Sequence, residues 1–345
     1  MTDNKQSSQI ISSTAGRDGA VDDVQDDAEN GAESEWREVS APIQSHGERL
    51  DRALADIVPE FSRSYLQQLI VAGAVQINGV VQVKSSARVK AGDVLNIELK
   101  PTPQSQAFKP EPMDLDVVYE DEFLLVINKP AGLVVHPAPG NWSGTLLNGL
   151  LARHAGASTL PRAGIVHRLD KDTSGLMVVA RQRQTMDQLV ELIAARTVTR
   201  QYIALAHGPW RGSKTRHVDF PVGRDPKNRL RMAVVDLGKT PGRLAATDIT
   251  LLESTAQHCL VQCKLHTGRT HQIRVHMSAL GHPLVSDVLY GGAVAGALQR
   301  QALHATRLAF QHPATGVRMS FVANPPEDML AEIADLGLIY NNGTN

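Results

Sequence analysis

The chain has 345 residues, 42% of them hydrophobic and 4% aromatic, and its formal net charge is −1. This length favours two folded units. No apolar run is long enough for a membrane span, and we expect no secretion signal and a cytoplasmic location. Cys259 and Cys263 fit no paired zinc motif, so two buried thiols on one strand face are expected.

The near-neutral net charge hides an asymmetry. Residues 1–40 hold ten acidic and three basic side chains, which gives −7, so the remainder carries −1 − (−7) = +6. Residues 1–43 contain few branched apolar residues and are predicted to be a disordered acidic tail. A basic body behind an acidic tail favours a nucleic-acid partner.

Residues 44–103 predict a small unit of two helices and a sheet. A helix over 50–57 stops at Pro59, and Ser62 caps a second helix that ends at Gly73. Asn78-Gly79 predicts a hairpin turn within 75–81, and a strand follows over 94–99. This pattern resembles the S4 RNA-binding domain. The resemblance makes five bases candidates for phosphate contacts, with ordinary solvated bases as the alternative: Arg49, Arg52, Arg63, Lys84 and Arg88.

Residues 104–115 are predicted to be a linker, since the segment 101–115 contains four prolines. From 116 to 340 helical and strand patterns mix. Strands are expected near 117–119, 123–127, 176–180, 202–206, 247–252, 260–265, 308–311 and 317–322, and helices near 146–151, 186–193, 273–280 and after Pro326. The fold class predicted for the whole chain is α+β, with a mostly antiparallel mixed sheet behind the S4-like domain.

Residues 164–175 form the densest polar segment, Gly-Ile-Val-His-Arg-Leu-Asp-Lys-Asp-Thr-Ser-Gly, between apolar runs. A functional loop on a rigid scaffold explains it better than a polar turn does. The segment is not a kinase motif, and Gly238-Lys239-Thr240 lacks the upstream glycine of a phosphate-binding loop. Asp170 and Asp172 are too close together to flank a sugar.

Residues 266–277 form a second dense segment, with histidines at 266, 271 and 276. At this spacing the three rings step roughly 140° around a helix, so they do not share one face and no metal site is expected. A strand-to-helix junction that turns Arg274 inward explains the pattern better.

Three blocks are similar to signatures of the RluA/RluD family of RNA pseudouridine synthases. They are the segment 164–175, Arg200-Gln201-Tyr202-Ile203-Ala204-Leu205, and Thr267-Gly268-Arg269-Thr270-His271-Gln272-Ile273-Arg274-Val275-His276. The resemblance covers about 116–325, including Asn128-Lys129-Pro130-Ala131-Gly132 and Leu303-His304-Ala305. It implies a cofactor-free isomerisation of uridine to pseudouridine in 23S rRNA, with the helix 69 stem-loop as the target.

The same resemblance assigns roles to residues. Asp170 is the catalytic carboxylate, Arg274 its cationic partner, and Tyr202 the active-site tyrosine. Arg168 could fill the stack that the extruded base leaves, and Leu303 could cover the base. Apart from the resemblance, the stretch 223–232 contains four bases and is predicted to be an RNA-contacting loop, with a mobile basic surface turn as the alternative: Arg224, Lys227, Arg229 and Arg231.

Two other functions stay open at this point. The chain could be a non-catalytic S4-type RNA-binding factor in ribosome assembly, or a synthase for other rRNA or tRNA sites. The expected partner is ribosomal RNA or a large-subunit precursor. The expected oligomeric state is a monomer.

Overall fold

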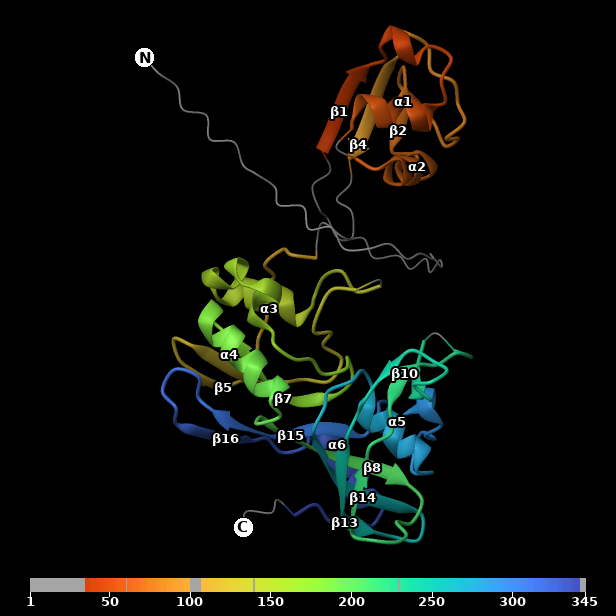
Figure 1. Cartoon of the computed structure of the whole chain (residues 1–345). Coiled ribbons are helices and arrows are strands. Elements are labelled where there is room, and N and C mark those ends of the chain that lie inside the picture. Colours follow the sequence, from red (N-terminus) through yellow and green to blue (C-terminus); the bar gives the residue numbers. More distant parts are fainter. Residues whose placement is uncertain (1–34, 60, 100–106, 139, 229, 342–345) are drawn as a thin grey trace. The chain divides into compact units, whose positions relative to one another are not determined.

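The computed structural model describes residues 35–59, 61–99, 107–138, 140–228 and 230–341 (Figure 1). The chain divides into two compact units, with the boundary between residues 101 and 102. Among the described residues, no helix is both long and apolar enough to cross a membrane.

The N-terminal unit is a four-stranded antiparallel sheet, in the order β1-β4-β2-β3, with two helices packed on it. Its elements are β1 (Glu35–Ser40), η1 (Ile43–Ser45), α1 (Leu50–Ile57), α2 (Arg63–Val71), β2 (Val75–Ile77), β3 (Val80–Val81) and β4 (Val94–Leu99). The predicted Ser62 cap is confirmed, because its Oγ accepts from the Tyr65 N–H over 3.3 Å. Asn78 and Gly79 both have positive φ, as the predicted hairpin turn requires.

The prediction of a disordered tail over residues 1–43 is wrong for residues 35–40. Residues 1–34 lie outside the described part of the chain, but Glu35–Ser40 form β1, which pairs with β4 from Glu35↔Leu99 to Ser40↔Val94. The sequence of β1 is rich in charge, so it does not read as a strand. The strand forms because the edge of β4 supplies its backbone hydrogen-bond partners, which local composition cannot reveal.

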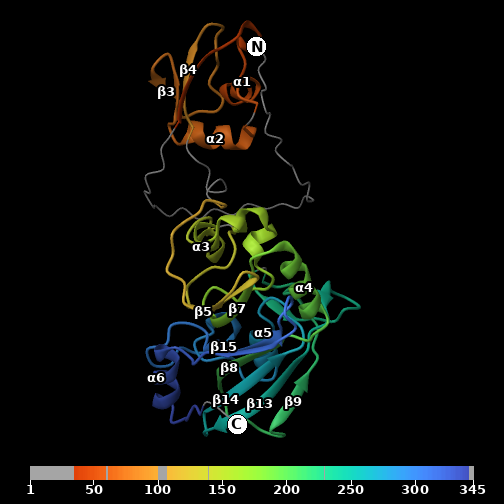
Figure 2. The ribbon, with the colours of Figure 1, turned by 90° about the vertical axis from the view of Figure 1, so that its left-hand side faces the viewer.

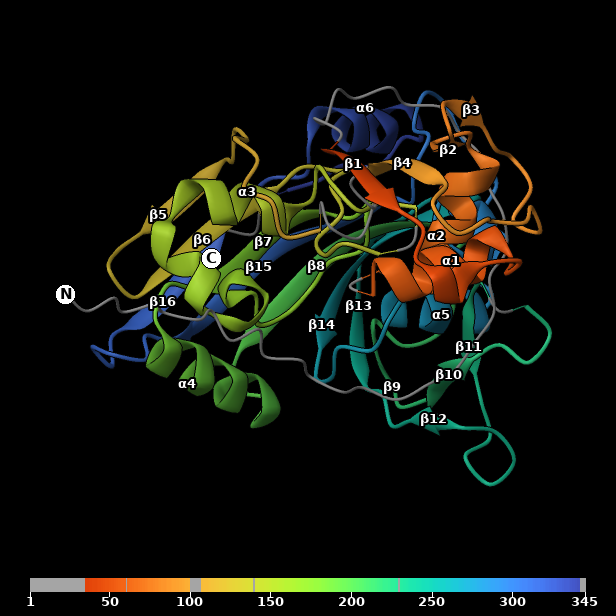
Figure 3. The same cartoon turned by 90° about the horizontal axis from the view of Figure 1, so that it is seen from above.

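The C-terminal unit is built on a nine-stranded, mostly antiparallel sheet. The order is β5-β6-β7-β15-β8-β14-β13-β9, with β16 paired to β15, and β7–β15 is a parallel pair (Figure 3). The strands are β5 (Val117–Glu120), β6 (Leu124–Lys129), β7 (Ser174–Ala180), β8 (Thr199–His207), β9 (Thr215–Val218), β13 (Thr247–Ser254), β14 (His258–Leu265), β15 (Leu303–Gln311) and β16 (Arg318–Val322). The helices are α3 (Leu146–Arg153), η3 (Ala155–Thr159), η4 (Pro161–Gly164), α4 (Arg183–Ala194), α5 (Gln272–Ala279), η5 (Val288–Tyr290) and α6 (Glu327–Asp335).

The centre of this sheet is buried on both faces. On β7, Met177 and Val179 join a core with α3, while Leu176 and Val178 join a second core with α4. Such two-sided burial explains why β7 reads as a continuous apolar run. Helix α6 closes a third core over β8 and β14, and Figure 2 shows it beside these strands.

The prediction of a linker over residues 104–115 is wrong for residues 107–115. Asn148 Nδ2 of α3 donates to the Lys109 carbonyl over 2.8 Å, and the Glu111 carboxylate accepts from the Gly144 N–H over 2.7 Å. Leu115 is buried in the core beneath α3. Residues 107–115 therefore belong to the C-terminal unit, because proline content does not reveal which surface an extended segment packs against.

A separate three-stranded sheet, in the order β11-β10-β12, was not predicted. It consists of β10 (Val222–Arg224), β11 (Met232–Val234) and β12 (Gly242–Arg243), and it lies beside α5 (Figure 1). Met232, Val275 and Tyr290 pack between the small sheet and this helix. The predicted basic loop is the connection from β10 to β11.

Candidate active site

A cavity of about 480 Å³ opens in the C-terminal unit. Its wall comes from the loop before β7, the start of β8, the junction of β14 and α5, and Leu303 of β15. Asp170, Tyr202 and Arg274 all line it, although they come from three distant parts of the sequence. The volume suits one small ligand.

The loop that carries Asp170 is fixed by hydrogen bonds from the buried side chain of Lys129. Lys129, 1% exposed, donates through Nζ to the carbonyls of Pro130, Leu133 and Lys171 over 2.8–2.9 Å. Gly132 N–H also donates to the Lys171 carbonyl, over 2.9 Å. The buried Lys129 ammonium binds the carbonyl of the residue after Asp170 and therefore fixes the position of the loop.

The end of the same loop is fixed by close packing. Gly175 has φ +117, and a Cβ there would collide with the backbone of Ala305 on β15. Ser174 Oγ lies 2.9 Å from His304 Nδ1, beside the same parallel pair. Glycine is required at 175 because the two backbones approach so closely.

Arg274 joins two carboxylates. Its Nε and Nη2 donate to Asp287 over 2.7 and 2.8 Å, and its Nη1 donates to Asp170 Oδ2 over 3.1 Å. The guanidinium carbon also lies 4.9 Å from the centre of the Tyr290 ring. Burial acts to lower the pKa of Arg274, but the two carboxylates outweigh it and raise the pKa. Arg274 stays charged and its fork is fixed.

His271 is a second neighbour of Asp170. It precedes α5 in a left-handed conformation, φ 55, and its Nε2 lies 3.8 Å from Asp170 Oδ2. Its Nδ1 lies 2.8 Å from the Tyr290 hydroxyl. Burial lowers the pKa of His271, so the neutral imidazole dominates at pH 7. Asp170 therefore sits between a fixed cation and a neutral ring.

Tyr202 lies on β8 and is 5% exposed. Burial raises its pKa to about 12, so the phenol keeps its proton at pH 7. Among the described residues no hydrogen bond engages its hydroxyl. Arg200, two residues earlier, also lines the cavity, and its Nε is buried without a hydrogen-bond partner in the described part of the chain. The Tyr202 hydroxyl is therefore available to a bound ligand, whereas the Arg200 Nε is itself buried.

The predicted histidine series separates into three environments. His271 faces Asp170, whereas His276 is fully buried between Thr247 Oγ1 and the Phe220 carbonyl. His266 pairs with Asp248 over 2.6 Å. His266 follows β14 and His271 precedes α5, so only His276 lies in the helix and the assumed helical spacing does not apply to the series.

The remaining predicted residues divide between the cavity and the surface. Arg168 is exposed and Leu303 is buried, and both line the cavity. Arg224 and Lys227 are exposed near the β10–β11 connection, where Arg231 pairs with Asp225 over 2.6 Å, and none of the three lines the cavity. Arg229 lies outside the described residues.

The basic residues of the N-terminal unit are not equivalent. Arg49 and Arg63 bind Asp51, which is fully buried, over 3.0 and 2.7 Å. Arg52 pairs with Glu48 over 3.4 Å, and Arg88 donates to the Gly47 carbonyl over 2.7 Å. Lys84 is exposed, with no ion pair to any described residue.

Sequence reasoning missed four residues that shape the site. Lys129 lies inside a quoted motif, and its apolar flanks were the available signal of burial. Arg200 and His271 also lie in the family motifs, but no role was predicted for them from the sequence. For His271, only the spacing of the histidines as possible metal ligands was considered. Asp287 lies in no quoted motif, and only the folded chain reveals its pairing with Arg274.

Comparisons with known proteins agree with this fold. The family model described as RNA pseudouridylate synthase matches residues 123–279, and the S4 domain model matches 48–95. Ribosomal large subunit pseudouridine synthase D of Neisseria meningitidis serogroup A is 46% identical over 323 residues, which cover 89% of this chain and 84% of that protein. The protein of the same name from Escherichia coli O6:H1 is 43% identical over 299 residues, which cover 82% and 89%.

Two solved human structures are also similar. RNA pseudouridylate synthase domain containing 4 has a TM-score of 0.52 at 26% identity, covering 66% of this chain and 95% of that one. Domain containing 1 has a TM-score of 0.50 at 29% identity, covering 63% and 86%. The fold and the relatives define an enzyme that modifies uridine in RNA. The chain belongs to the RNA pseudouridylate synthase family, with an S4 domain ahead of its pseudouridine synthase domain.

Proposed function

We propose that this pseudouridine synthase acts on large-subunit ribosomal RNA, with uridines of the helix 69 stem-loop of 23S rRNA as targets and Asp170 as the reacting carboxylate. The target class rests on the names of the relatives, which are large-subunit synthases. The observation that carries the role of Asp170 is its pairing with Arg274 at the wall of the cavity.

The reaction is an isomerisation that needs one carboxylate and no outside reagent. The bond from N1 to C1′ breaks, the uracil turns, and a bond forms from C5 to C1′. The C5 proton leaves, and N1 gains a proton, so atoms and electrons balance. An ionised Asp170 can start this in two ways, by attacking C1′ or by removing the C2′ proton. Deuterium at C2′ distinguishes the routes, because only proton removal breaks that bond.

Arg274 suits both routes. Because Asp287 engages Nε and Nη2, the guanidinium presents Nη1 to Asp170 without rotating. It thereby holds Asp170 Oδ2 in one position and leaves Oδ1 without a bond to this arginine. Among the described residues, no hydrogen bond engages Asp170 Oδ1, and this oxygen is the one proposed to react.

The cavity accepts a single extruded nucleotide. A base inside a helix cannot reach Asp170, so the target uridine flips out at a cost of about a few kcal/mol. Tyr202 offers a ring face and a protonated hydroxyl to the uracil, and Leu303 covers it. Arg168 takes the place vacated in the stack. Further cavity arginines attract the phosphates: Arg162, Arg196, Arg200 and Arg269.

The test uses 23S rRNA from a bacterial strain that lacks its own large-subunit synthase. The full-length protein is incubated with this RNA, and pseudouridines are mapped at single-nucleotide resolution. The expected result is new pseudouridine in the helix 69 stem-loop. Conversion only at other sites in rRNA or in tRNA would overturn the assignment of the helix 69 stem-loop as the target. Tight RNA binding without conversion would instead support a role as a ribosome-assembly factor.

A further inference from the structure

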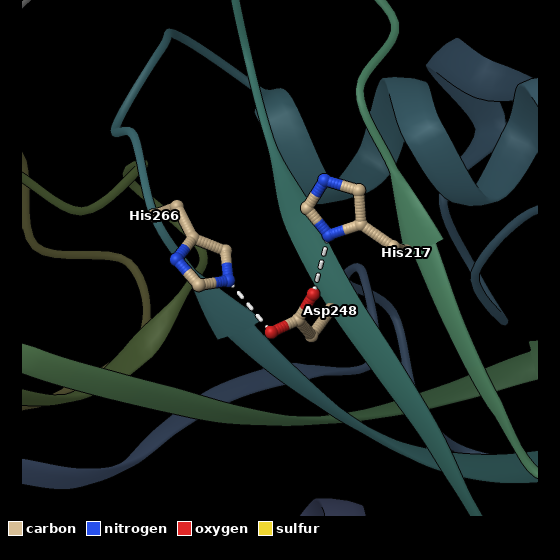
Figure 4. A group of neighbouring side chains, drawn as sticks. All are labelled: His217, Asp248 and His266. Atoms are coloured by element: carbon tan, nitrogen blue, oxygen red, sulfur yellow. Dashed lines mark hydrogen bonds and ion pairs between the residues drawn. The ribbon is translucent and has the colours of Figure 1, made fainter.

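A group of three potential metal ligands lies outside the reacting residues. His217 lies on β9, Asp248 on β13, and His266 directly after β14, and Figure 4 shows both imidazoles turned toward the one carboxylate. His217 Nδ1 lies 2.6 Å from Asp248 Oδ1, and His266 Nε2 lies 2.6 Å from Asp248 Oδ2. The second ring nitrogen of each histidine faces away from Asp248 (Figure 4).

The strand register creates this group. Asp248 stands directly opposite His217 on β9 and opposite Lys264 on β14. His266 is two residues beyond Lys264, and a hydrogen bond from its N–H to the Ala246 carbonyl continues the pairing. Side chains two residues apart on a strand share a face, so the three ligands gather on one side of the sheet. The next residue along β13, Ile249, is fully buried on the other side.

The ligand atoms are close enough for one ion. All three lie within 4.8 Å of one another, whereas donors around a tetrahedral zinc ion are about 3.3 Å apart. Each imidazole nitrogen is already 2.6 Å from the carboxylate, closer than two donors on one ion, so a bound ion would replace both hydrogen bonds and separate these pairs. The adjustment can fall on His217, whose side chain is 58% exposed and therefore free to rotate. Its movement disturbs no core packing.

We propose that His217, Asp248 and His266 form a binding site for a divalent transition metal ion of the zinc class. Two neutral imidazoles and one carboxylate match the ligands that zinc takes in sites with an open fourth position. Each imidazole can place its hydrogen on the outward nitrogen, which frees the inward lone pair for the metal. The carboxylate charge then half-compensates the charge of the ion.

The site would connect the sheet edge to the active-site cavity. His266 lines that cavity and begins the segment that leads to His271 and Arg274. An ion held there ties β9 and β13 to the start of this segment. The site is independent of the RNA target, so its test requires no RNA.

The experiment measures metal binding by untagged, full-length protein after treatment with a chelator. Titration calorimetry with Zn²⁺ and visible absorption with Co²⁺ are the readouts, and Mg²⁺ is the comparison ion because it prefers oxygen ligands. We expect one Zn²⁺ per chain at micromolar affinity or tighter, a tetrahedral Co²⁺ spectrum without thiolate bands, and a rise in Tm on adding Zn²⁺.

Two variants and a matched control assign the ligands. His217→Ala and the isosteric Asp248→Asn are each expected to weaken Zn²⁺ binding at least about tenfold. His258→Ala is the control, since its ring lies 5.2 Å from His207 and this pair has no place in the proposed site. Its affinity should equal that of the unmodified protein. An absence of saturable Zn²⁺ binding, or equal binding by His217→Ala and the unmodified chain, would overturn the proposal and leave a hydrogen-bonded surface triad.

Discussion

Two aspartates in the two units meet arginines with different consequences. Asp51 of the S4 domain is fully buried and accepts hydrogen bonds from Arg49, Arg63 and Gln67. Burial acts to raise its pKa, but these hydrogen bonds outweigh it and hold the pKa well below its usual range. Asp170 is 17% exposed and accepts one hydrogen bond from Arg274.

The comparison indicates how neighbours separate a structural carboxylate from the one proposed to react. Three side chains saturate Asp51, which leaves it no oxygen for chemistry. At Asp170 the arginine is largely engaged by Asp287, so it stabilises the negative charge without saturating it. An ion pair in sequence or structure is therefore not by itself a sign of catalysis. What distinguishes the two carboxylates is the number of hydrogen-bond donors that each one receives.

Among substitutions at the neighbours of Asp170, the largest expected effect is at Arg274. Lysine offers a point charge and cannot bind Asp287 and Asp170 together, so Arg274→Lys should reduce kcat about 10³-fold. Single-turnover conversion of an RNA substrate measures it. Arg183→Lys is the control, because Arg183 pairs with exposed Asp187 over 3.0 Å. A kcat within twofold of the unmodified enzyme would remove Arg274 from the account.

The two units should also differ in how their stability changes as the pH falls. Burial lowers the pKa of His304 to about 4, against about 6.5 when unfolded. Between these values the unfolded chain binds a proton that the folded chain does not, so stability is lost as pH falls from about 6.5 to 4, by up to about 3 kcal/mol. Asp51 has a lowered pKa, so its contribution is lost only below its unfolded value of 3.8.

Urea unfolding at a series of pH values measures this difference. The C-terminal unit should weaken first, and His304→Gln should make its slope of unfolding free energy against pH shallower. Other buried histidines contribute to the same slope, so the change is a partial one. An unchanged slope in the variant would show that His304 is not a source of acid sensitivity.

Asp51→Asn tests the structural carboxylate in the comparison with Asp170. The substitution removes the buried charge but leaves two half-exposed arginines that water can solvate, so the loss in unfolding free energy should be about 2 kcal/mol. Denaturant unfolding checks it. Because Asp51 is not in the cavity, kcat on a saturating RNA substrate should be unchanged. A lower kcat with unchanged stability would contradict the structural role.

The smallest effect is expected at Lys84. It is exposed and pairs with no described residue, whereas Arg52 already pairs with Glu48. Lys84→Ala should weaken RNA binding about threefold and reduce the slope of log affinity against log salt by about one. Arg52→Ala should change both less. Binding titrations at several salt concentrations give the slopes, and equal slopes for all three proteins would exclude a phosphate contact at Lys84.

The sequence predicted those features whose causes lie within a short motif. The loop 164–175 and the junction 266–277 meet in one cavity, because local patterning places each at the end of a buried strand. Helix caps such as Ser62 and turns such as Asn78-Gly79 were equally accessible, since their causes lie within a few residues.

Pairings between distant segments were not accessible. The strand Glu35–Ser40 forms because β4 offers an edge, and Asp287 is buried because Arg274 is near. His217 and Asp248 meet through strand register across 31 residues of sequence. Each of these depends on which backbone lies alongside, and periodicity within one segment carries no such information.

The most direct measurement is single-turnover conversion of uridine by Asp170→Asn, together with its RNA affinity. Asparagine keeps the shape of the side chain but can neither attack C1′ nor take a C2′ proton. The account predicts an RNA Kd close to that of the unmodified enzyme, with pseudouridine formation reduced at least about 10⁴-fold. Conversion at an undiminished rate would contradict a reacting carboxylate at position 170.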